Sequence, residues 1–134
     1  MGLVNDGFPV FVCADALDDS GYALTLDTAN EGVKKAGSGD VLLGVAATGT
    51  TDMFGNAESN KEVAVIPVGR SLIVEVQLAP DNQAISWGDP LCVDSGTDGT
   101  FDLRDGTNET GDIVAYALED AAASSGGKIK ALLL

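Results

Sequence analysis

Histidine is absent from this sequence of 134 residues, and cysteine occurs only twice, at Cys13 and Cys92. Without histidine there is no Ser-His-Asp triad, and two cysteines outside a CxxC spacing do not make a structural zinc site. The sequence also lacks a GxSxG elbow, a P-loop and a GxGxxG turn. We therefore predict a protein that is not an enzyme, with no catalytic residues and no cofactor.

Basic residues are scarce: seven Lys and Arg stand against 21 Asp and Glu, which gives a net charge of −14. Binding to nucleic acid needs clustered cations, so we expect no nucleic-acid partner. No apolar run approaches the roughly 20 residues of a membrane helix, and the first ten residues lack the basic segment of a secretory signal. We expect no membrane partner.

The acidic excess itself indicates a preference for high salt. At about 1 M salt the Debye length falls to about 3 Å, so neighbouring carboxylates scarcely repel one another. At low salt the same surface pushes itself apart. We interpret the composition as adaptation to a saline, halophilic setting; an ordinary acidic protein kept soluble by its charge is the alternative.

Aromatic residues make up only 5% of the chain, whereas hydrophobic residues make up 45%. The apolar content is too high for a disordered chain, and a core must be built mostly from Ala, Val and Leu. We expect Cys13 and Cys92 to be buried free thiols, although a disulfide stays open at this point.

Short apolar segments that alternate with Gly/Asp turns every 8–12 residues are the dominant pattern, and several of them have a period of two. They predict an all-β fold: a compact β-barrel or β-sandwich of about ten short strands with little helix. We place a strand in each of the segments 10–13, 22–26, 41–46, 62–68, 72–78 and 128–134. One short helix is expected within 118–127, ended by Gly126 and Gly127.

Two stretches repeat the same pattern of strand, turn and strand, which suggests an internal duplication. Leu24, Asp27 and Gly32 match Leu91, Asp94 and Gly99 at an offset of 67, and GDVLLGVA (39–46) matches GDIVAYAL (111–118) at an offset of 72. We divide the chain into an N-terminal arm, 1–9, and a single β-barrel domain, 10–134, with pseudo-repeats at about 10–70 and 72–134.

The loop that begins at Asp94 half-resembles a calcium loop, with candidate ligands Asp94, Asp98, Asp102 and Asp105. Gly96 replaces the third ligand, however, and Asp105 stands where the closing Glu is expected. A β-turn formed by Asp and Gly explains the same residues, and we prefer that interpretation. Asn108 begins an N-glycosylation triplet, which we interpret as a polar loop. The segment 102–111 is what the repeat leaves unexplained, so we look there first for a specific feature.

The second half of the chain resembles the small β-barrel capsid cement, or head-decoration, proteins of tailed viruses. The motif I-x-W-G-D-P-L-x-V is followed by G-x-F, by a Gly-Asp-Ile-Val strand that ends in Ala-Leu, and by Gly-Gly-Lys-Ile-Lys before a terminal aliphatic run. Ala115 and Tyr116 depart from the glycine of the family's third strand, which the earlier copy keeps as Gly44. The matching residues are Ile85, Gly88, Asp89, Val93, Gly99, Phe101, Ala117, Leu118, Gly127, Ile129, Ala131 and Leu132.

This resemblance implies a capsid decoration protein that assembles in the host cytoplasm and then lies on the outer surface of the virion. It implies a homotrimer whose partner is the major capsid protein of an icosahedral shell. We predict contacts through the N-terminal arm and exposed apolar anchors, although the anchors could instead cap the barrel ends. A surface-exposed receptor- or glycan-binding β module is the alternative. The contact candidates are Leu3, Val4, Phe8, Met53, Phe54 and Trp87.

Overall fold

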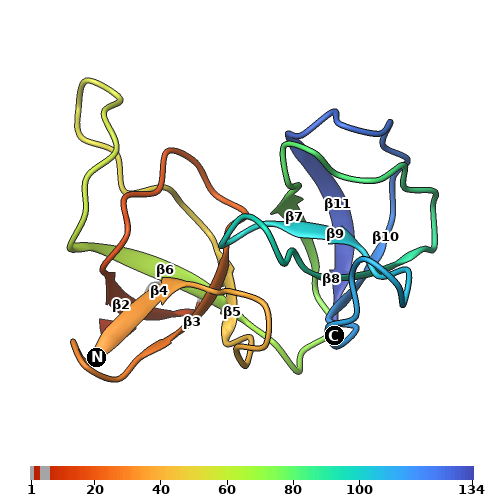
Figure 1. The fold of residues 1–134 in the computed structure, drawn as a ribbon. Helices are drawn as coiled ribbons and strands as arrows, with labels where there is room; N and C mark the ends of the chain where they lie inside the picture. Colours follow the sequence, from red (N-terminus) through yellow and green to blue (C-terminus); the bar gives the residue numbers. More distant parts are fainter. Residues whose placement is uncertain (1, 4–6) are drawn as a thin grey trace.

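The computed structural model describes residues 2–3 and 7–134, which form eleven β-strands and no helix. The strands form two separate sheets that lie side by side as two lobes (Figure 1). The predicted all-β barrel architecture of about ten short strands is confirmed. Within the described ranges no helix has the length and apolarity needed to span a membrane.

The first lobe is a closed five-stranded barrel with one additional edge strand. Its order is β1-β2-β4-β3-β5-β6, and β6 returns to pair with β2, which closes the barrel. All pairs are antiparallel except β2 with β4, which meet in parallel at Cys13 and Val33. The strands are β1 (Gly2–Leu3), β2 (Pro9–Cys13), β3 (Ala23–Asp27), β4 (Gly32–Lys35), β5 (Gly44–Ala46) and β6 (Lys61–Pro67).

The second lobe is a five-stranded sheet whose order is β7-β11-β10-β8-β9. A parallel bridge between Leu78 and Phe101 joins its first and last strands, and the Ala79 N–H donates to the Phe101 carbonyl at 3.0 Å. The sheet therefore curls into a second barrel. The strands are β7 (Ile73–Gln77), β8 (Pro90–Val93), β9 (Phe101–Leu103), β10 (Ala115–Ala117) and β11 (Lys128–Leu133).

The two barrels have the same connectivity, which is the arrangement that a duplicated β unit produces. Strands β2 to β6 correspond in order to β7 to β11, and the bridge between Cys13 and Val33 corresponds to the bridge between Leu78 and Phe101. Leu24 pairs with Gly44, and Leu91 pairs with Ala115. The offset between β5 and β10 is therefore 71 and not the predicted 72. Because side chains alternate between the two faces of a strand, this difference of one residue decides which side chains face inward.

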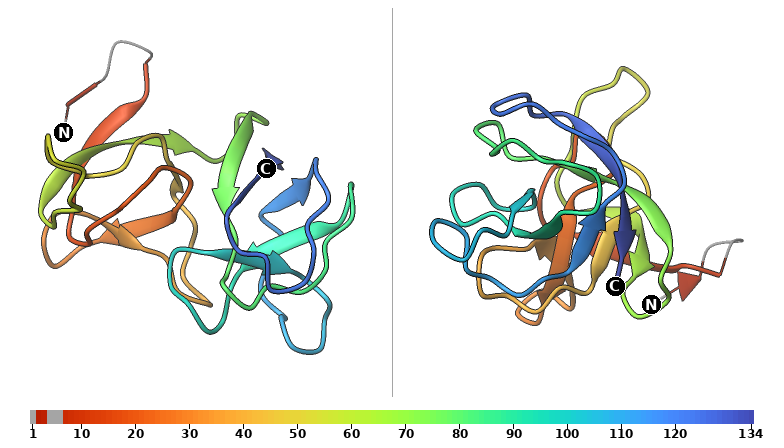
Figure 2. Two further views of the ribbon diagram at one scale, coloured as in Figure 1. Left: turned by 90° about the horizontal axis from the view of Figure 1, so that it is seen from above. Right: turned by 90° about the vertical axis from the view of Figure 1, so that its right-hand side faces the viewer.

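A hydrophobic core crosses the boundary between the barrels. It contains Phe101, Leu91 and Ile129 of the second barrel together with Ala23, Leu42 and Val45 of the first. Gly99 bridges the lobes through two backbone bonds of 2.8 Å, accepting from the Ala23 N–H and donating to the Ala36 carbonyl. A smaller core lies inside the first barrel, around Leu17, Leu24, Val33, Val63 and Val65. Figure 2 shows the two lobes side by side in its left view and one in front of the other in its right view. That residues 10–134 form one folding unit stays a prediction.

The helix predicted within 118–127 does not form. Ala121 pairs instead with Ile85, with backbone bonds of 2.8 and 2.9 Å in the two directions. The Ser124 N–H donates to the Asn82 carbonyl, and the buried Asn82 amide donates to the Ala122 carbonyl. Partners distant in sequence thus take the backbone groups that a helix would need, which outweighs the helix propensity of three consecutive alanines.

Candidate functional site

An exposed apolar tip is the most prominent surface feature of the first barrel. The segment 47–60 projects from the barrel as a hairpin, held by a bridge between Thr51 and Ala57 (Figure 1). At its end the side chains of Met53 and Phe54 are 89% and 81% exposed. We call this segment the tip hairpin. Neither side chain caps a barrel end, which was the alternative considered for them.

The tip hairpin is held in shape by its own hydrogen bonds. Oδ1 of Asp52 accepts from the N–H groups of Phe54 and Asn56 at 2.8 and 2.9 Å. These backbone donors, the Asn56 N–H first, hold the pKa of the Asp52 carboxyl below its usual range. At the root, the buried Thr50 hydroxyl donates to the Glu58 carbonyl at 2.6 Å and accepts from the Leu17 N–H at 2.8 Å. An ordered backbone therefore presents two apolar side chains to solvent.

Trp87 is the exposed aromatic residue of the second barrel, with 69% of its surface accessible. It lies in a turn closed by a bond from the Asp89 N–H to the Ser86 carbonyl. Carboxylates flank the turn: Asp120 accepts from the Trp87 N–H at 2.7 Å, and Asp89 accepts from the Ser86 N–H at 2.8 Å. This turn belongs to the second barrel, whereas the tip hairpin belongs to the first.

The N-terminal contact candidates are placed only in part. Leu3 belongs to β1, which pairs with β2 of its own chain; Val4 lies outside the described residues. The ring of Phe8 is half-buried, with the Arg70 guanidinium 5.8 Å from its centroid. Phe8 is thus already in contact with the turn between the barrels.

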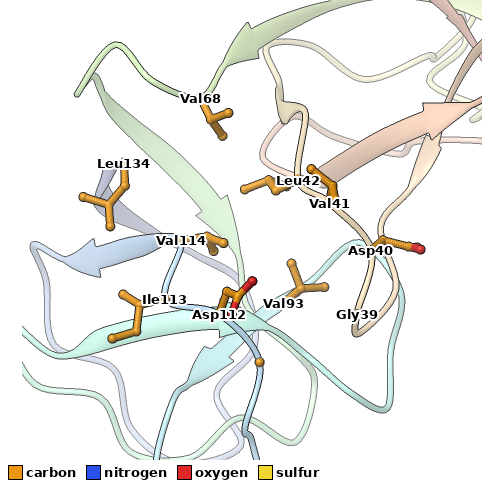
Figure 3. Close-up of a pocket in the computed structure, with 11 residues that line it drawn as sticks. Gly39, Asp40, Val41, Leu42, Val68, Val93, Asp112, Ile113, Val114 and Leu134 are labelled. Carbon is orange, nitrogen blue, oxygen red and sulfur yellow. The ribbon is translucent and has the colours of Figure 1, made fainter.

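A groove of about 330 Å³ lies between the barrels near the C-terminus. Figure 3 shows aliphatic side chains from both barrels along its walls, among them Leu42, Val68 and Val114. Asp40 and Asp112 line the same groove. Val41 is 84% exposed beside it, and Leu134 is 39% exposed, whereas Leu133 is buried. The last of the three C-terminal leucines thus borders this groove.

Three buried carboxyl groups meet at one edge of the second barrel. Asp94, Asp102 and Glu109 are 3%, 4% and 6% exposed, and each offers an oxygen within 4.8 Å of the others. Asp94 accepts from the N–H groups of Gly96 and Thr97, and Asp102 accepts from those of Gln83 and Leu103. Glu109 accepts from the Ser95 hydroxyl at 2.8 Å. We call these three residues the carboxyl cluster.

Burial dominates the electrostatics of the carboxyl cluster. Desolvation raises the pKa of Asp102 and of Glu109, and the neighbouring Asp94 carboxylate raises both further. Hydrogen bonds from Gln83 to Asp102 and from Ser95 to Glu109 oppose this shift. Among the described side chains, no lysine or arginine forms an ion pair with the cluster. Three buried like charges at this spacing favour the binding of a proton by the cluster.

Of the four candidate cation ligands, the structure brings Asp94 and Asp102 together and leaves out Asp98 and Asp105. Asp98 is exposed. Asp105 instead accepts from the N–H groups of Thr107, Asn108 and Glu109, which lowers the pKa of its carboxyl to about 2. The third member of the cluster, Glu109, comes from the segment 102–111. Carboxylate oxygens are the ligands that Ca²⁺ uses, and the cluster offers three of the six to eight that it takes.

Glu109 carried no signal of its own in the sequence. It is one of 21 acidic residues, and its position is marked only by the Asn108 triplet, of which it is the middle residue. The available signal is that the loop within 102–111 is longer than its counterpart in the first repeat. That segment folds back over the loop after β8 and buries its one glutamate there.

Both cysteines are buried free thiols, as expected. Burial, followed by the neighbouring Glu109 carboxylate, raises the pKa of Cys92 to about 12. Burial likewise raises the pKa of Cys13. Because the thiolate is the reactive form, neither position has the character of a nucleophile.

The sequence matches no protein-family model, and no curated protein matches it significantly. The resemblance to capsid decoration proteins therefore depends on the short motifs of the second half alone.

Proposed function

We propose that this chain is a structural virion protein that decorates the outer surface of an icosahedral capsid and stabilises contacts between major capsid proteins. The observation that carries the proposal is the ordered tip hairpin, whose Met53 and Phe54 are two of the three most exposed large apolar side chains among the described residues. Met and aromatic residues are enriched at protein–protein interfaces, whereas an exposed apolar pair costs free energy without a partner.

The acidic surface is compatible with such contacts only when charge is screened. At molar salt the −14 chain can approach another acidic surface, and apolar contacts are not weakened by screening. A tailed virus of a halophilic host is therefore the setting we propose. The homotrimer implied by the resemblance belongs to the same proposal.

A glycan-binding role is the second candidate, and the turn at Trp87 favours it. An exposed indole can stack on the apolar face of a sugar, and nearby carboxylates such as Asp89 and Asp120 can accept hydrogen bonds from its hydroxyl groups. Asp89 and Asp120 each accept one backbone bond through a single oxygen, whereas both oxygens of Asp52, the carboxylate of the tip hairpin beside Met53, accept bonds inside the hairpin.

Substitution of the two exposed sites separates the candidates. The test measures binding of the purified chain, at molar salt, to capsids prepared without it and, in parallel, to an array of glycans. We expect Met53→Ser with Phe54→Ser to weaken capsid binding at least about tenfold, because these side chains would be the buried anchors. Trp87→Ala serves as the matched control, and we expect it to leave capsid binding unchanged.

Both variants should unfold like the wild type, because the substituted side chains contact water. Capsid binding that is equal in the wild type and in the tip variant would overturn the assignment of the tip hairpin. A chain that ignores capsids and binds glycans through Trp87 would establish the second candidate instead.

A further inference from the structure

One strand edge of the first barrel is covered by the N-terminal strand. Strand β2 pairs with β6 on one edge, where Val10 lies opposite Ala64. On its other edge the same Val10 lies opposite Gly2, and Pro9 lies opposite Leu3. On this edge β4 meets β2 only at Cys13. The two-residue strand β1 covers the remaining part of the edge.

The corresponding edge of the second barrel has no such cover. Because Cys13 corresponds to Leu78, Pro9 and Val10 correspond to Val74 and Glu75 of β7. Strand β7 pairs with β11 on one edge, and no strand pairs with its other edge between Ile73 and Glu75 in the described part of the chain. A free edge of this kind is a template for pairing with another strand.

The hydrogen-bond pattern shows which backbone groups are free. The Leu72 carbonyl accepts a bond from the Leu133 N–H, and the Leu78 N–H donates to the Gly127 carbonyl, so these backbone groups at the two ends of β7 point toward β11. Because the direction alternates along a strand, the backbone groups of Ile73, Glu75 and Gln77 point away from β11. The Gln77 N–H donates to the Gly21 carbonyl at 2.9 Å, and Gly21 also lies against the Glu75 carbonyl. No described residue bonds the N–H and C=O of Ile73 or the N–H of Glu75.

The side chains at this edge also face solvent. Ile73 is 66% exposed although it lies in the middle of the apolar run 72–74, and the Glu75 side chain is 56% exposed. An added strand would cover Ile73 as well as the free backbone groups. Two or three backbone bonds alone would not offset the entropy of association, so burial of this side chain is part of the expected affinity.

We propose that the free β7 edge binds the N-terminal strand, Gly2–Leu3, of a second copy of this chain, after that strand leaves β2 of its own chain. The chain itself shows that this strand fits the corresponding edge of β2. The free stretch is only three residues long and is closed at one end by Gly21, which suits a short strand. If two copies instead paired through their β7 strands, the turn at Ser71 of one copy would lie against Gly21 of the other, so we prefer the N-terminal strand as the occupant.

The proposed contact joins the first barrel of one copy to the second barrel of the next. Such a head-to-tail contact uses two different surfaces, so it builds a closed ring or an open filament, depending on the rotation between copies. The inference concerns self-assembly alone. Self-assembly can fail while capsid binding is observed, and capsid binding can fail while self-assembly is observed, so the two proposals are tested separately.

The test uses two variants of the full chain at molar salt, each of which removes one side of the contact. Ile73→Pro removes the free N–H without touching the ladder to β11, because that N–H points away from β11. Ile73→Thr keeps the N–H and is its matched control. Substitution of Gly2 and Leu3 by Pro removes the ability of the arm to pair. Mass is measured by analytical ultracentrifugation over a range of protein concentrations, with circular dichroism as a check of folding.

We expect the wild type to assemble with increasing concentration and both proline variants to stay monomeric. Ile73→Thr should assemble, with a midpoint at least about tenfold below the highest concentration at which Ile73→Pro is measured and found monomeric. An equimolar mixture of the two proline variants should form a 1:1 dimer, because one supplies an intact arm and the other an intact edge.

Three results would overturn the proposal. The first is a wild type that stays monomeric at every concentration. The second is assembly that survives the prolines in the arm, which would indicate another occupant of the edge. The third is a mixture of the two variants that forms no dimer. If Ile73→Pro does not fold, a peptide of residues 1–8 is titrated into the wild type at a concentration where it is monomeric, because its own strand β1 then covers β2 and leaves β7 as the free edge. Absence of binding counts against the proposal.

Discussion

At the scale of single residues, the carboxyl cluster is where burial and charge oppose each other most directly. Asp94 follows β8 and Asp102 lies in β9, and Glu109 joins them from the loop after β9, which is longer than its counterpart in the first repeat. The sequence identified two of the three members. It could not identify Glu109, because nothing local distinguishes a glutamate that will be buried from the exposed acids around it.

We predict that Glu109→Gln flattens the pH dependence of stability. Raised pKa values mean that the folded cluster holds protons that the unfolded chain has already released. The free energy of unfolding of the wild type should therefore fall as pH rises above about 4.5, the ordinary glutamate value, until the raised pKa values are passed. Glutamine resembles the protonated side chain, so the variant should be as stable as the wild type in acid and more stable at neutral pH.

Urea unfolding of both proteins between pH 4 and pH 8 at constant molar salt measures this difference. Glu31→Gln is the matched control, because it removes one carboxylate from an exposed turn. Parallel pH profiles for the wild type and Glu109→Gln would show that the cluster holds no additional proton.

At the scale of strands and turns, close backbone approaches explain two glycines of the first barrel. A Cβ on Gly44 in β5 would lie 2.2 Å from the Ile66 carbonyl oxygen, and a Cβ on Gly32 in β4 would lie 2.2 Å from that of Val12. Both glycines stand where a strand crosses closely over its neighbour. In the sequence Gly32 is recognised only as a match to Gly99, because the crossing that requires it depends on Val12, twenty residues earlier.

We predict that Gly44→Ala lowers the free energy of unfolding by at least about 2 kcal/mol, because the added methyl group forces β5 and β6 apart. Gly111→Ala is the matched control: its nearest neighbour would be 3.6 Å away, an ordinary contact, and we expect a change within about 0.5 kcal/mol. Chemical denaturation at molar salt measures both. Equal stability of the two variants would contradict the close approach at Gly44.

The incorrect expectations at this scale share one cause. The alanine run at 121–123 has helical propensity, and the offset of 72 keeps Gly-Asp aligned with Gly-Asp. The structure pairs Ala121 with Ile85 and places Ala115 opposite Leu91. Both outcomes depend on hydrogen bonds to residues more than twenty positions away, which a local pattern does not contain.

At the scale of the whole molecule, the shared core predicts that the two barrels unfold together. Ala23, Ala36, Leu42 and Val45 belong to the first barrel but pack in the core of the second. Calorimetry at molar salt should therefore show one transition, with equal calorimetric and van 't Hoff enthalpies. Two resolved transitions would mean that each barrel is an independent folding unit.

Low salt should destabilise the protein, because 21 acidic groups face only seven basic ones. We expect the melting temperature to fall by at least about 5 °C between 2 M and about 0.02 M sodium chloride, as screening is lost. Replacement of the exposed Asp98 and Asp112 by Asn should reduce this difference. A melting temperature independent of salt would contradict the halophilic interpretation.

The sequence by itself determined the all-β class, the two repeats and the acidic surface. Alternation with a period of two, Gly/Asp turns and charge are local or additive properties, so no contact had to be known to recognise them. The tertiary structure alone decided that each repeat closes into a barrel, that the barrels share a core, and that Met53 and Phe54 face water while Glu109 does not. Closure and burial depend on which distant residues meet, and only the folded chain decides that.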